Sequence, residues 1–415
     1  MKKFLALILA LVMALSLVAC GGGNDTPNNT DEPDDTAAKV KVGFITLHDE
    51  NSTYDLNFIN GAKEAIANLG LTDADYILKT NVPEGQECYD TAMDLVDEGC
   101  NIIFADSFGH EPFMIDAAKE HPEVQFCHST GTRAHTEGLA NYHNAFASIY
   151  EGRYLAGIAA GMKLNEMIEN GTEINGVKVT ADNAKIGYVG AFTYAEVVSG
   201  YTSFYLGAKS VCPTVTMDVT FTGSWYDEAL EKEGAQKLIA GGCNLISQHA
   251  DSLGAPTACE NAGVPNVSYN GSTQAAGPNT YIISSRINWA PYYEYAIQCV
   301  IDGKAIDADW TGTLATGSVV LTELNTNVAA AGTQEAIDAA MAELEAGTLH
   351  VFDCSKFTVK GEALTSYKAD VDTDADYTPD TEVVHDGYFA ESEFRSAPYF
   401  DLEIDGITRL DVNFG

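Results

Sequence analysis

A tryptophan, a tyrosine and an aspartate stand side by side at residues 225–227, directly before a stretch with helical character. Large aromatic side chains at the start of a helix are not needed to fill the middle of a core. An indole face at the edge of a cleft can stack on a planar ring, and stacking of a nucleic-acid base contributes about 1–3 kcal/mol. A neighbouring carboxylate can accept charge-assisted hydrogen bonds from the rim of that ring. The cluster therefore indicates a site for a flat molecule with polar edges.

Asp227 also has a purely structural interpretation. Ser224 and Asp227 have the spacing of a capping box, in which side chains satisfy the free backbone N–H groups at the start of a helix. Capping gives Asp227 a role without a ligand, but it does not account for Trp225. Both interpretations of Asp227 stay open at this point.

Similar mixtures of aromatic, acidic and amide side chains follow other segments that look like strands. In a parallel α/β sheet, ligands bind beyond the carboxyl ends of the strands, where the loops gather. This mixture fits a purine base or a nucleoside, and it fits an inorganic ion poorly because the aromatic rings would have no role. The predicted ligand-binding residues are Tyr54, Asp55, Phe58, Ser107, Phe108, Phe192, Tyr194, Trp225, Asp227, Gln248, Asp251 and Asn270.

The elements that must position these residues alternate between strand and helix. Residues 40–46 read as a buried strand and 57–70 as a helix closed by a glycine, and the alternation continues to about residue 130. A long helix at 150–167 follows, in which Gly157 and Gly161 predict a close approach of another backbone. The alternation then restarts. Repeated βαβ units predict two similar lobes, each a parallel sheet flanked by helices.

Changes in this pattern suggest how the chain is divided. The segment at 280–303 reads as a strand followed by a helix that returns to the first lobe. The expected divisions are a signal peptide at 1–19, a lipidated cysteine and disordered tether at 20–38, lobe 1 at 39–148 plus about 284–315, and lobe 2 with a C-terminal extension at 149–283 plus parts of 316–415.

The first residues have the pattern of a secretory signal. Lys2 and Lys3 precede the apolar run 4–18, which is too short and wrongly flanked for a stable transmembrane span. The sequence LVAC ending at Cys20 resembles a bacterial lipobox, which implies diacylation of Cys20 and cleavage just before it. An ordinary secretory signal with a chance cysteine is the alternative. Residues 21–38 contain no bulky apolar side chain and are expected to form a flexible tether.

Charge and cysteine content exclude some classes of protein. The chain has 22 Lys and Arg against 60 Asp and Glu, a formal net charge of −38. Such a surface repels nucleic acid and anionic lipid, so we expect no nucleic-acid partner. The cysteines other than Cys20 are scattered, with no CxxC and no metal-type spacing. Several lie in apolar runs, where cysteine acts as a small hydrophobic residue. Their even number permits disulfides, but the spacing does not pair them.

Seven motifs, in the same order along the chain, carry a family resemblance. They are the lipobox, DENSTYDLNFINGAKE, IIFADSFGHEP, YEGRYLAGIAAGMK, KIGYVGAF, SWYDEALEKEGAQKLIAGGCNLISQHADS and NWAPYYEYAI. Over about residues 40–350 the chain resembles the basic membrane protein family of ABC-transporter substrate-binding lipoproteins, and within it the purine-binding branch. The residues that match the family's ligand-binding motifs are Asp55, Phe58, Ser107, Phe108, Trp225, Asp227, Gln248 and Asp251.

The resemblance implies a two-lobed, periplasmic-binding-protein-like fold of type I that holds a base or nucleoside between its lobes. It also implies a lipid-anchored protein on the extracytoplasmic face of the cell membrane, an ABC permease as partner, no catalysis, no metal and no cofactor. The chain departs from the family after the strand that reads VSYNGST. Relatives place an aspartate there, whereas this chain offers Asn270, Gly271 and Ser272.

Other functions have less support in the sequence. The chain has no nucleophile elbow, HExxH, P-loop or GxGxxG after a strand, so an enzyme has little support. His249 with Asp251 could form the metal pair of a hydrolase, but no partner cluster accompanies them. Residues 370–376 alternate acids like a calcium loop but lack its glycine and its closing glutamate. The same fold could bind riboflavin, a sugar or a signalling molecule, or serve a chemoreceptor, although the aromatic residues favour a planar ring.

Overall fold

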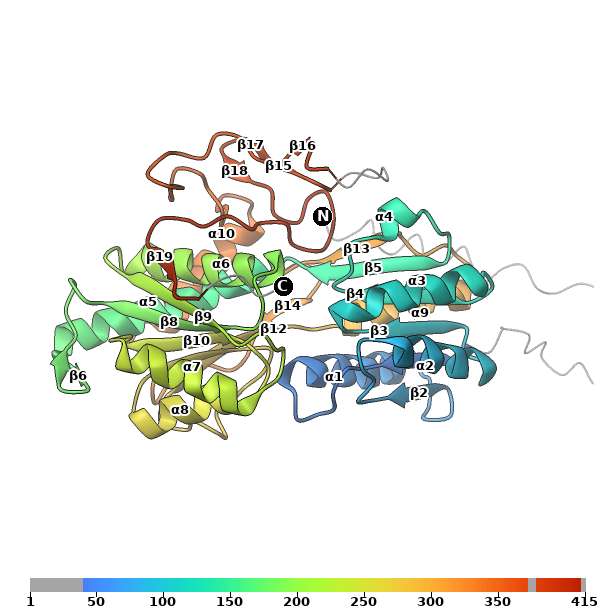
Figure 1. The fold of residues 1–415 in the computed structure, drawn as a ribbon, viewed down its shortest axis with the longest axis horizontal. Helices are drawn as coiled ribbons and strands as arrows, with labels where there is room; N and C mark the ends of the chain where they lie inside the picture. Colours follow the sequence, from blue (N-terminus) through green and yellow to red (C-terminus); the bar gives the residue numbers. More distant parts are fainter. Residues whose placement is uncertain (1–39, 372–377, 412–415) are drawn as a thin grey trace, which may run out of the picture. The chain divides into compact units, whose positions relative to one another are not determined.

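The computed structural model describes residues 40–371 and 378–411, and these form two α/β lobes (Figure 1). The sheet of lobe 1 has the strand order β13-β5-β4-β3-β1-β2, and every neighbouring pair is parallel. Its strands are β1 (Val42–Ile45), β2 (Tyr76–Lys79), β3 (Ile102–Ala105), β4 (Gln125–Ser129), β5 (Tyr142–Ala147) and β13 (Asp309–Gly312).

Helices cover both faces of this sheet, as parallel sheets require. One hydrophobic cluster joins α1 and α9 to the sheet, and a second joins α2 and α3 to the other face. The helices of lobe 1 are α1 (Thr53–Asn68), α2 (Gln86–Asp97), α3 (Glu111–Glu120), α4 (Ala134–Glu137) and α9 (Ala290–Asp302), with the 3-10 turn η1 (Phe108–His110).

The sheet of lobe 2 has the order β14-β12-β11-β10-β8-β9-β19. Only the edge strand β14 runs antiparallel to its neighbour among these described strands. The strands are β8 (Lys185–Gly190), β9 (Thr216–Phe221), β10 (Leu245–His249), β11 (Asn266–Tyr269), β12 (Tyr281–Ile287), β14 (Val319–Leu321) and β19 (Ile407–Arg409).

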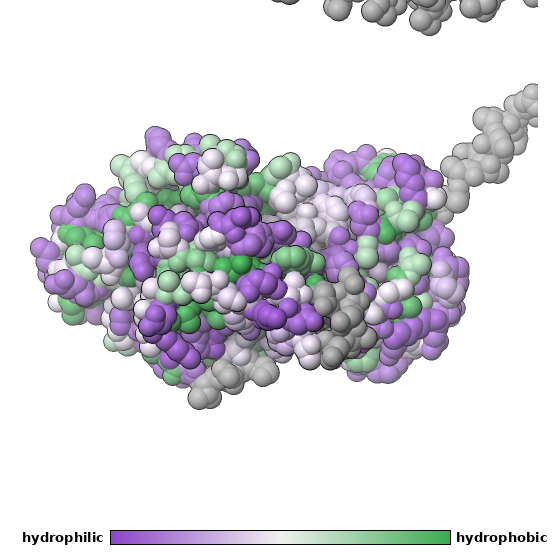
Figure 2. Space-filling view, turned by 90° about the horizontal axis from the view of Figure 1, so that it is seen from above, coloured by the Kyte–Doolittle hydropathy of each residue, from purple (hydrophilic) through white to green (hydrophobic). Residues whose placement is uncertain are grey.

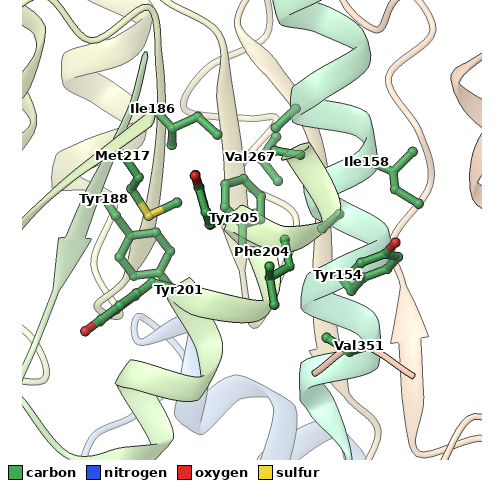
Figure 3. Close-up of a cluster of buried hydrophobic side chains, with 14 of the residues drawn as sticks. Tyr154, Ile158, Ile186, Tyr188, Tyr201, Phe204, Tyr205, Met217, Val267 and Val351 are labelled. Atoms are coloured by element: carbon green, nitrogen blue, oxygen red, sulfur yellow. The ribbon is translucent and has the colours of Figure 1, made fainter. Parts of the chain in front are cut away.

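One face of this second sheet packs on α5 (Ile149–Asn170) and α6 (Ala195–Val211), and the other on α7 (Glu228–Ala240) and α8 (Gly254–Ala262). Tyrosine, phenylalanine and aliphatic side chains from α5, α6 and the strands fill the space between helices and sheet (Figure 3). The close approach predicted for α5 is confirmed, because a Cβ at Gly157 would lie only 2.1 Å from the carbonyl oxygen of Phe204 in α6.

The chain after residue 312 adds to lobe 2. β14 joins the sheet, and α10 (Thr333–Glu345) packs on α5. Residues 346–371 and 378–411, called the extension below, lie over α6 and α10 in Figure 1 and end with β19 at the sheet edge. Small two-stranded pairs complete the described chain: β6 (Glu173–Ile174) with β7 (Val177–Lys178), β15 (Lys368–Ala369) with β16 (Thr381–Glu382), and β17 (Val384–His385) with β18 (Tyr388–Phe389).

Two details differ from the sequence expectation. β5 was not predicted, because its buried positions include His143 and Asn144, whose polarity hides the strand pattern. The strand at 281–287 pairs with β11 in lobe 2, so the return to lobe 1 begins after Ile287 rather than at about residue 284. In the described chain the backbone passes between the lobes after β5, after β12 and after β13.

One face of the molecule carries mostly polar side chains (Figure 2). Figure 2 shows hydrophilic side chains over most of one face and hydrophobic ones only in small groups. No helix in the described ranges is both long enough and apolar enough to span a bilayer. The eight cysteines that the structure describes are all buried free thiols. The predicted lipidation residue Cys20, the predicted tether at 21–38 and most of the acidic stretch 370–376 lie outside the described residues.

Candidate ligand-binding site

A cavity lies where the carboxyl ends of the two sheets face each other. It is nearly closed, with about 20 Å³ in which the centre of a water molecule can move, which is room for about one water. A planar ring can enter only if the lobes or the side chains move apart. The cavity is lined by Leu47, His48, Tyr54, Asp55, Ser107, Phe108, Thr130, Glu196, Trp225, His249, Asp251 and Asn270.

Asp55 is the acid that lobe 1 contributes to the wall. It lies in the first turn of α1, where Oδ1 accepts a hydrogen bond of 2.7 Å from the backbone N–H of His48 and Oδ2 accepts one of 2.6 Å from the Ser52 hydroxyl. Burial raises the pKa of Asp55, but the hydrogen bonds from His48 and Ser52 outweigh it and leave that pKa below its usual value. Asp55 is therefore an ionised acceptor at the cavity.

Asp106 lies directly behind this wall and adds a second buried acid. Its Oδ1 accepts a hydrogen bond from the backbone N–H of Leu47, and its carbonyl oxygen accepts one of 2.7 Å from the Tyr54 hydroxyl. Burial, reinforced by the negative charge of Asp55, raises the pKa of Asp106 well above its ordinary range. Two buried carboxyl groups so close together do not both ionise.

Trp225 and Asp251 form the corresponding wall of lobe 2. Trp225 is half-buried, follows β9 and packs its indole edge-on against Phe192, with the ring centres 5.0 Å apart. Asp251 follows β10, and its Oδ1 accepts a hydrogen bond of 3.2 Å from the Asn270 side chain. Burial, followed by the charges of Asp55 and Glu231, raises the pKa of Asp251 well above its ordinary value. Burial therefore favours the protonated form of Asp251.

Direct contacts between the lobes close the cavity. The backbone N–H of Thr53 donates to the carbonyl oxygen of Asp251 at 3.0 Å, and the side chain of Asn57 donates to the carbonyl oxygen of Asn270 at 2.5 Å. Aromatic rings also meet across the lobes: Phe108 with Tyr194 at 5.2 Å and His48 with Tyr226 at 5.5 Å.

Seven of the predicted residues line this cavity, and others stand behind it. Phe58 is buried in lobe 1, where its ring stacks on Trp289 with the centres 4.4 Å apart. Gln248 is also buried, and its Oε1 accepts a hydrogen bond of 3.0 Å from the side chain of Asn266. Both side chains support the walls rather than face the cavity.

Phe192 and Tyr194 form an aromatic support for Trp225. Their rings stack on each other at 5.2 Å, and Tyr194 also reaches the indole of Trp225 at 6.0 Å. Neither is in the lining, but together they fix the plane that Trp225 presents.

Asp227 caps a helix. It is the N-cap of α7, and its Oδ1 accepts hydrogen bonds of 3.0 and 2.9 Å from the backbone N–H groups of Ala229 and Leu230. The capping interpretation holds with one change, since the Ser224 hydroxyl donates to the carbonyl oxygen of Tyr226 instead of taking part in the cap. Asp227 does not line the cavity.

Five lining residues were not among the predicted site residues: Leu47, His48, Thr130, Glu196 and His249. Leu47, His48, Thr130 and His249 come at or just after the carboxyl end of a strand, so the strand-end rule contains a signal for them. Glu196 lies in the first turn of α6, beyond the loop that follows β8. The sequence alone does not tell which side chain of each loop faces the ligand. No group of three or more His, Cys, Asp or Glu residues able to hold a metal ion occurs within residues 40–371 and 378–411.

Residues 44–344 match the family of PnrA-like ABC transporter substrate-binding proteins. The chain belongs to this family. A purine-binding protein of Brucella abortus is 31% identical over 64% of this chain and 70% of its own length. A Haloferax volcanii protein named for glucose binding is 34% identical over 55% of the chain, and the match spans only about half of that relative, 53%. A nucleoside-binding protein of Lactococcus lactis is 24% identical over 61% of this chain and 67% of its own length.

Solved structures bear out the fold expected of a PnrA-like protein. A solute-binding protein of an ABC transporter system from Conexibacter woesei covers 75% of this chain and 98% of its own, with 21% identity and a TM-score of 0.58. The match to the PnrA-like family ends at residue 344, so the extension lies beyond it.

The lining gives this PnrA-like protein a definite chemistry. Three carboxyl groups, those of Asp55, Glu196 and Asp251, face the cavity, and its lining includes no lysine or arginine. Flat aromatic side chains stand beside them. Such a cavity is suited to a ring that donates hydrogen bonds from its edge, and it disfavours an anion.

Proposed function

We propose that this PnrA-like protein captures a purine base or a nucleoside between its two lobes and delivers it to an ABC permease. Binding shifts an equilibrium between open and closed arrangements of the lobes, as in other hinge-closing proteins. In this function the protein is not an enzyme and uses no cofactor or metal.

The lining of the cavity is the observation that carries this proposal. Trp225 and Phe108 offer aromatic faces from opposite lobes, and ionised Asp55 can accept N–H or O–H donors between them. Ring stacking contributes about 1–3 kcal/mol per base, and it has no counterpart for a small ion. A ligand held by both lobes also favours the closed arrangement, because only that arrangement offers both sets of contacts.

The relatives support two ligand classes. The purine-binding and nucleoside-binding relatives favour a planar base, and the aromatic walls agree with them. The relative named for glucose binding makes a sugar the second candidate. Sugars also stack on aromatic rings, so a direct comparison of ligands is needed.

We also propose that the protein works on the extracytoplasmic face of the cell membrane. An importer's binding protein must meet its ligand outside the cytoplasm, and the lipobox-like LVAC segment provides an anchor through a lipid on Cys20. Mass spectrometry of the protein purified from membranes tests this step. The expected product begins at a diacylated Cys20, and an unmodified Cys20 contradicts the anchor.

A thermal-shift screen tests the ligand class. Adenine, hypoxanthine, adenosine, inosine, riboflavin, glucose and ribose are each added to the purified protein. A ligand at 100 times its Kd stabilises the folded state by about 2.7 kcal/mol, which raises the melting temperature. We expect purines or nucleosides to raise it. A melting temperature raised only by glucose or ribose contradicts the proposal.

Trp225→Ala should weaken binding of the responding purine by about tenfold or more, because the stacking surface is lost. Isothermal titration calorimetry measures the change. Trp310→Ala is the matched control: Trp310 packs against Tyr292 and Tyr295 in lobe 1 and does not line the cavity. Equal affinities for Trp225→Ala and the wild type contradict the assignment of the site.

A further inference from the structure

Arg153 is a fully buried cation directly behind the candidate site. Its side chain in α5 is 0% exposed, and it lies against the rings of Phe204 and Tyr269, each 4.9 Å from the guanidinium carbon. Its hydrogen-bond partners in the described chain are hydroxyl and carbonyl oxygens from Tyr188, Ser247, Ser268 and Ser285, none of them a carboxylate. A buried charge is costly unless a compensating charge or polar network meets it.

A chain of polar groups connects this cation to the cavity. Nη2 of Arg153 lies 3.0 Å from the Tyr188 hydroxyl, which lies 3.4 Å from Nδ1 of His249. Nε2 of His249 lies 3.5 Å from Oε1 of Glu196. His249 and Glu196 both line the cavity, so the chain begins in the core of lobe 2 and ends at the ligand.

The charge of Arg153 determines which group donates and which accepts at each step of this series of hydrogen bonds. A guanidinium only donates, so the Tyr188 hydroxyl accepts from Arg153 and can give its own proton to Nδ1 of His249. Nδ1 is then an acceptor, which places the ring proton on Nε2, facing Glu196. Burial raises the pKa of Tyr188 to about 12, so its hydroxyl keeps the proton that it donates. The result is a donor–acceptor chain that runs from Arg153 to the carboxylate of Glu196.

His249 stays neutral in this arrangement. Burial lowers the pKa of His249, Arg153 lowers it further, and Glu196 acts in the opposite direction. The charged and titratable groups that face its ring are Glu196 from α6, Tyr188 from β8, Arg153 from α5 and Tyr269 from β11. A neutral ring with its proton on Nε2 can donate that proton to Oε1 of Glu196.

We propose that Glu196 is a further ligand-contacting carboxylate, and that Arg153 positions it through Tyr188 and His249. The ligand it takes is a ring with N–H or O–H donors on its edge, and this inference rests on the proposed function. Arg153, Tyr188 and His249 are positioning residues: they fix the orientation and charge environment of the acceptor. Glu196 was not predicted from the sequence, because the network joins residues from four different elements.

Glu196→Gln tests the ligand contact. The amide keeps the shape but removes the charge and turns one acceptor into a donor, so we expect adenosine or hypoxanthine, whichever binds the wild type, to bind about tenfold more weakly or worse. Calorimetric titration measures the affinity. A change of less than about twofold overturns the assignment of Glu196.

Tyr188→Phe tests the positioning chain, with Tyr201→Phe as its control. Tyr201 is buried in the same core, as Figure 3 shows, and its hydroxyl accepts a hydrogen bond from Arg409, but it does not reach the cavity. We expect Tyr188→Phe to weaken binding about three- to tenfold and Tyr201→Phe to leave it unchanged.

Nitrogen NMR of the His249 ring provides a readout that does not depend on a ligand. The wild type and Tyr201→Phe should show a neutral ring with its proton on Nε2 at neutral pH, and should take up a second proton only at a lower pH than a free imidazole does. In Tyr188→Phe the freed Nδ1 should take up a proton as the pH falls. Identical His249 spectra in all three proteins overturn the positioning chain. A wild type that binds no purine but shows these spectra contradicts the proposed function alone.

Discussion

The buried cavity wall explains why an uncharged asparagine suits position 270. Its φ of 64° is in the left-handed region, which asparagine tolerates better than most residues. Its side chain donates to Asp251, an acid already held protonated by burial and by neighbouring charges. An aspartate at position 270 would add another carboxyl group to this wall, where burial and like charges already oppose ionisation. The asparagine thus supports Asp251 without adding charge.

Asp227 is expected to stabilise the start of α7 rather than to contact the ligand. Asp227→Ala removes the acceptor for two backbone N–H groups at the start of α7, so it should lower the free energy of unfolding by about 1 kcal/mol. Asp227→Asn keeps the cap and should leave stability nearly unchanged. Urea titration measures stability, and calorimetry measures affinity for the responding purine, which we expect to change in neither variant. A tenfold loss of affinity in Asp227→Asn alone would make Asp227 a ligand contact.

The packing of α5 on α6 fixes part of the geometry of lobe 2. α5 and α6 pack so closely that a Cβ at Gly207 would lie 2.0 Å from the carbonyl oxygen of Tyr154. α5 carries Arg153 and follows the first passage between lobes, while α6 carries Glu196 in its first turn. The close helix contact therefore helps to hold both ends of the polar chain behind the cavity.

Gly157→Ala should destabilise this helix pair. Its new methyl group would meet the carbonyl oxygen of Phe204 at 2.1 Å, and overpacking of this kind costs about 1–3 kcal/mol. Gly234→Ala in α7 is the matched control, since its nearest neighbour is a methyl group of Thr220 at 3.3 Å. Thermal unfolding compares the two variants. A Gly157→Ala protein as stable as Gly234→Ala would show that the helices do not touch at this point.

The extension lies beyond the residues that match the family, and it contacts both lobes. It packs Phe389 and Phe400 into the hydrophobic cluster of lobe 2 and adds β19 to that sheet. It also reaches lobe 1, where the backbone N–H of Ser396 donates to Oδ2 of Asp309 at 2.7 Å. Any rotation of one lobe against the other must accommodate this contact.

A pH effect on stability is expected from Glu391 in the extension. Glu391 is 2% exposed and accepts hydrogen bonds from Ser199 and Ser392, while Glu151 and Arg395 act on it from further away. Burial raises its pKa from 4.5 to about 7. Between these values the folded protein binds more protons than the unfolded chain, so stability falls as the pH rises. The stability that Glu391 contributes is fully present below pH 4.5, and it is lost as the pH rises through about 7.

Glu391→Gln should remove this dependence. The variant should gain stability relative to the wild type at pH 8, and the gain should shrink at pH 4.5, where both side chains are neutral in the fold. Melting temperatures at the two pH values measure the difference. Glu362→Gln, at an exposed position of the same extension, serves as the control and should show no such pattern. Parallel pH profiles for wild type and Glu391→Gln would contradict the assignment.

The sequence by itself determined the two lobes and the sheet edges at which their loops gather. Alternating strands and helices can bury their apolar faces only as layered sheets, and parallel strands bring their carboxyl ends to a common edge. For this reason the strand-end residues Tyr54, Asp55, Ser107, Trp225 and Asp251 were predicted and line the cavity.

The tertiary structure decided which side chains face that cavity and which stand behind it. Phe58 stands behind the cavity, where Trp289, far along the chain, stacks on it. Glu196 lines the cavity, with its Oε1 3.5 Å from Nε2 of His249. Each of these contacts joins segments that are distant in sequence. Local pattern sets where a loop begins, whereas the direction of a side chain depends on the neighbours that folding brings to it.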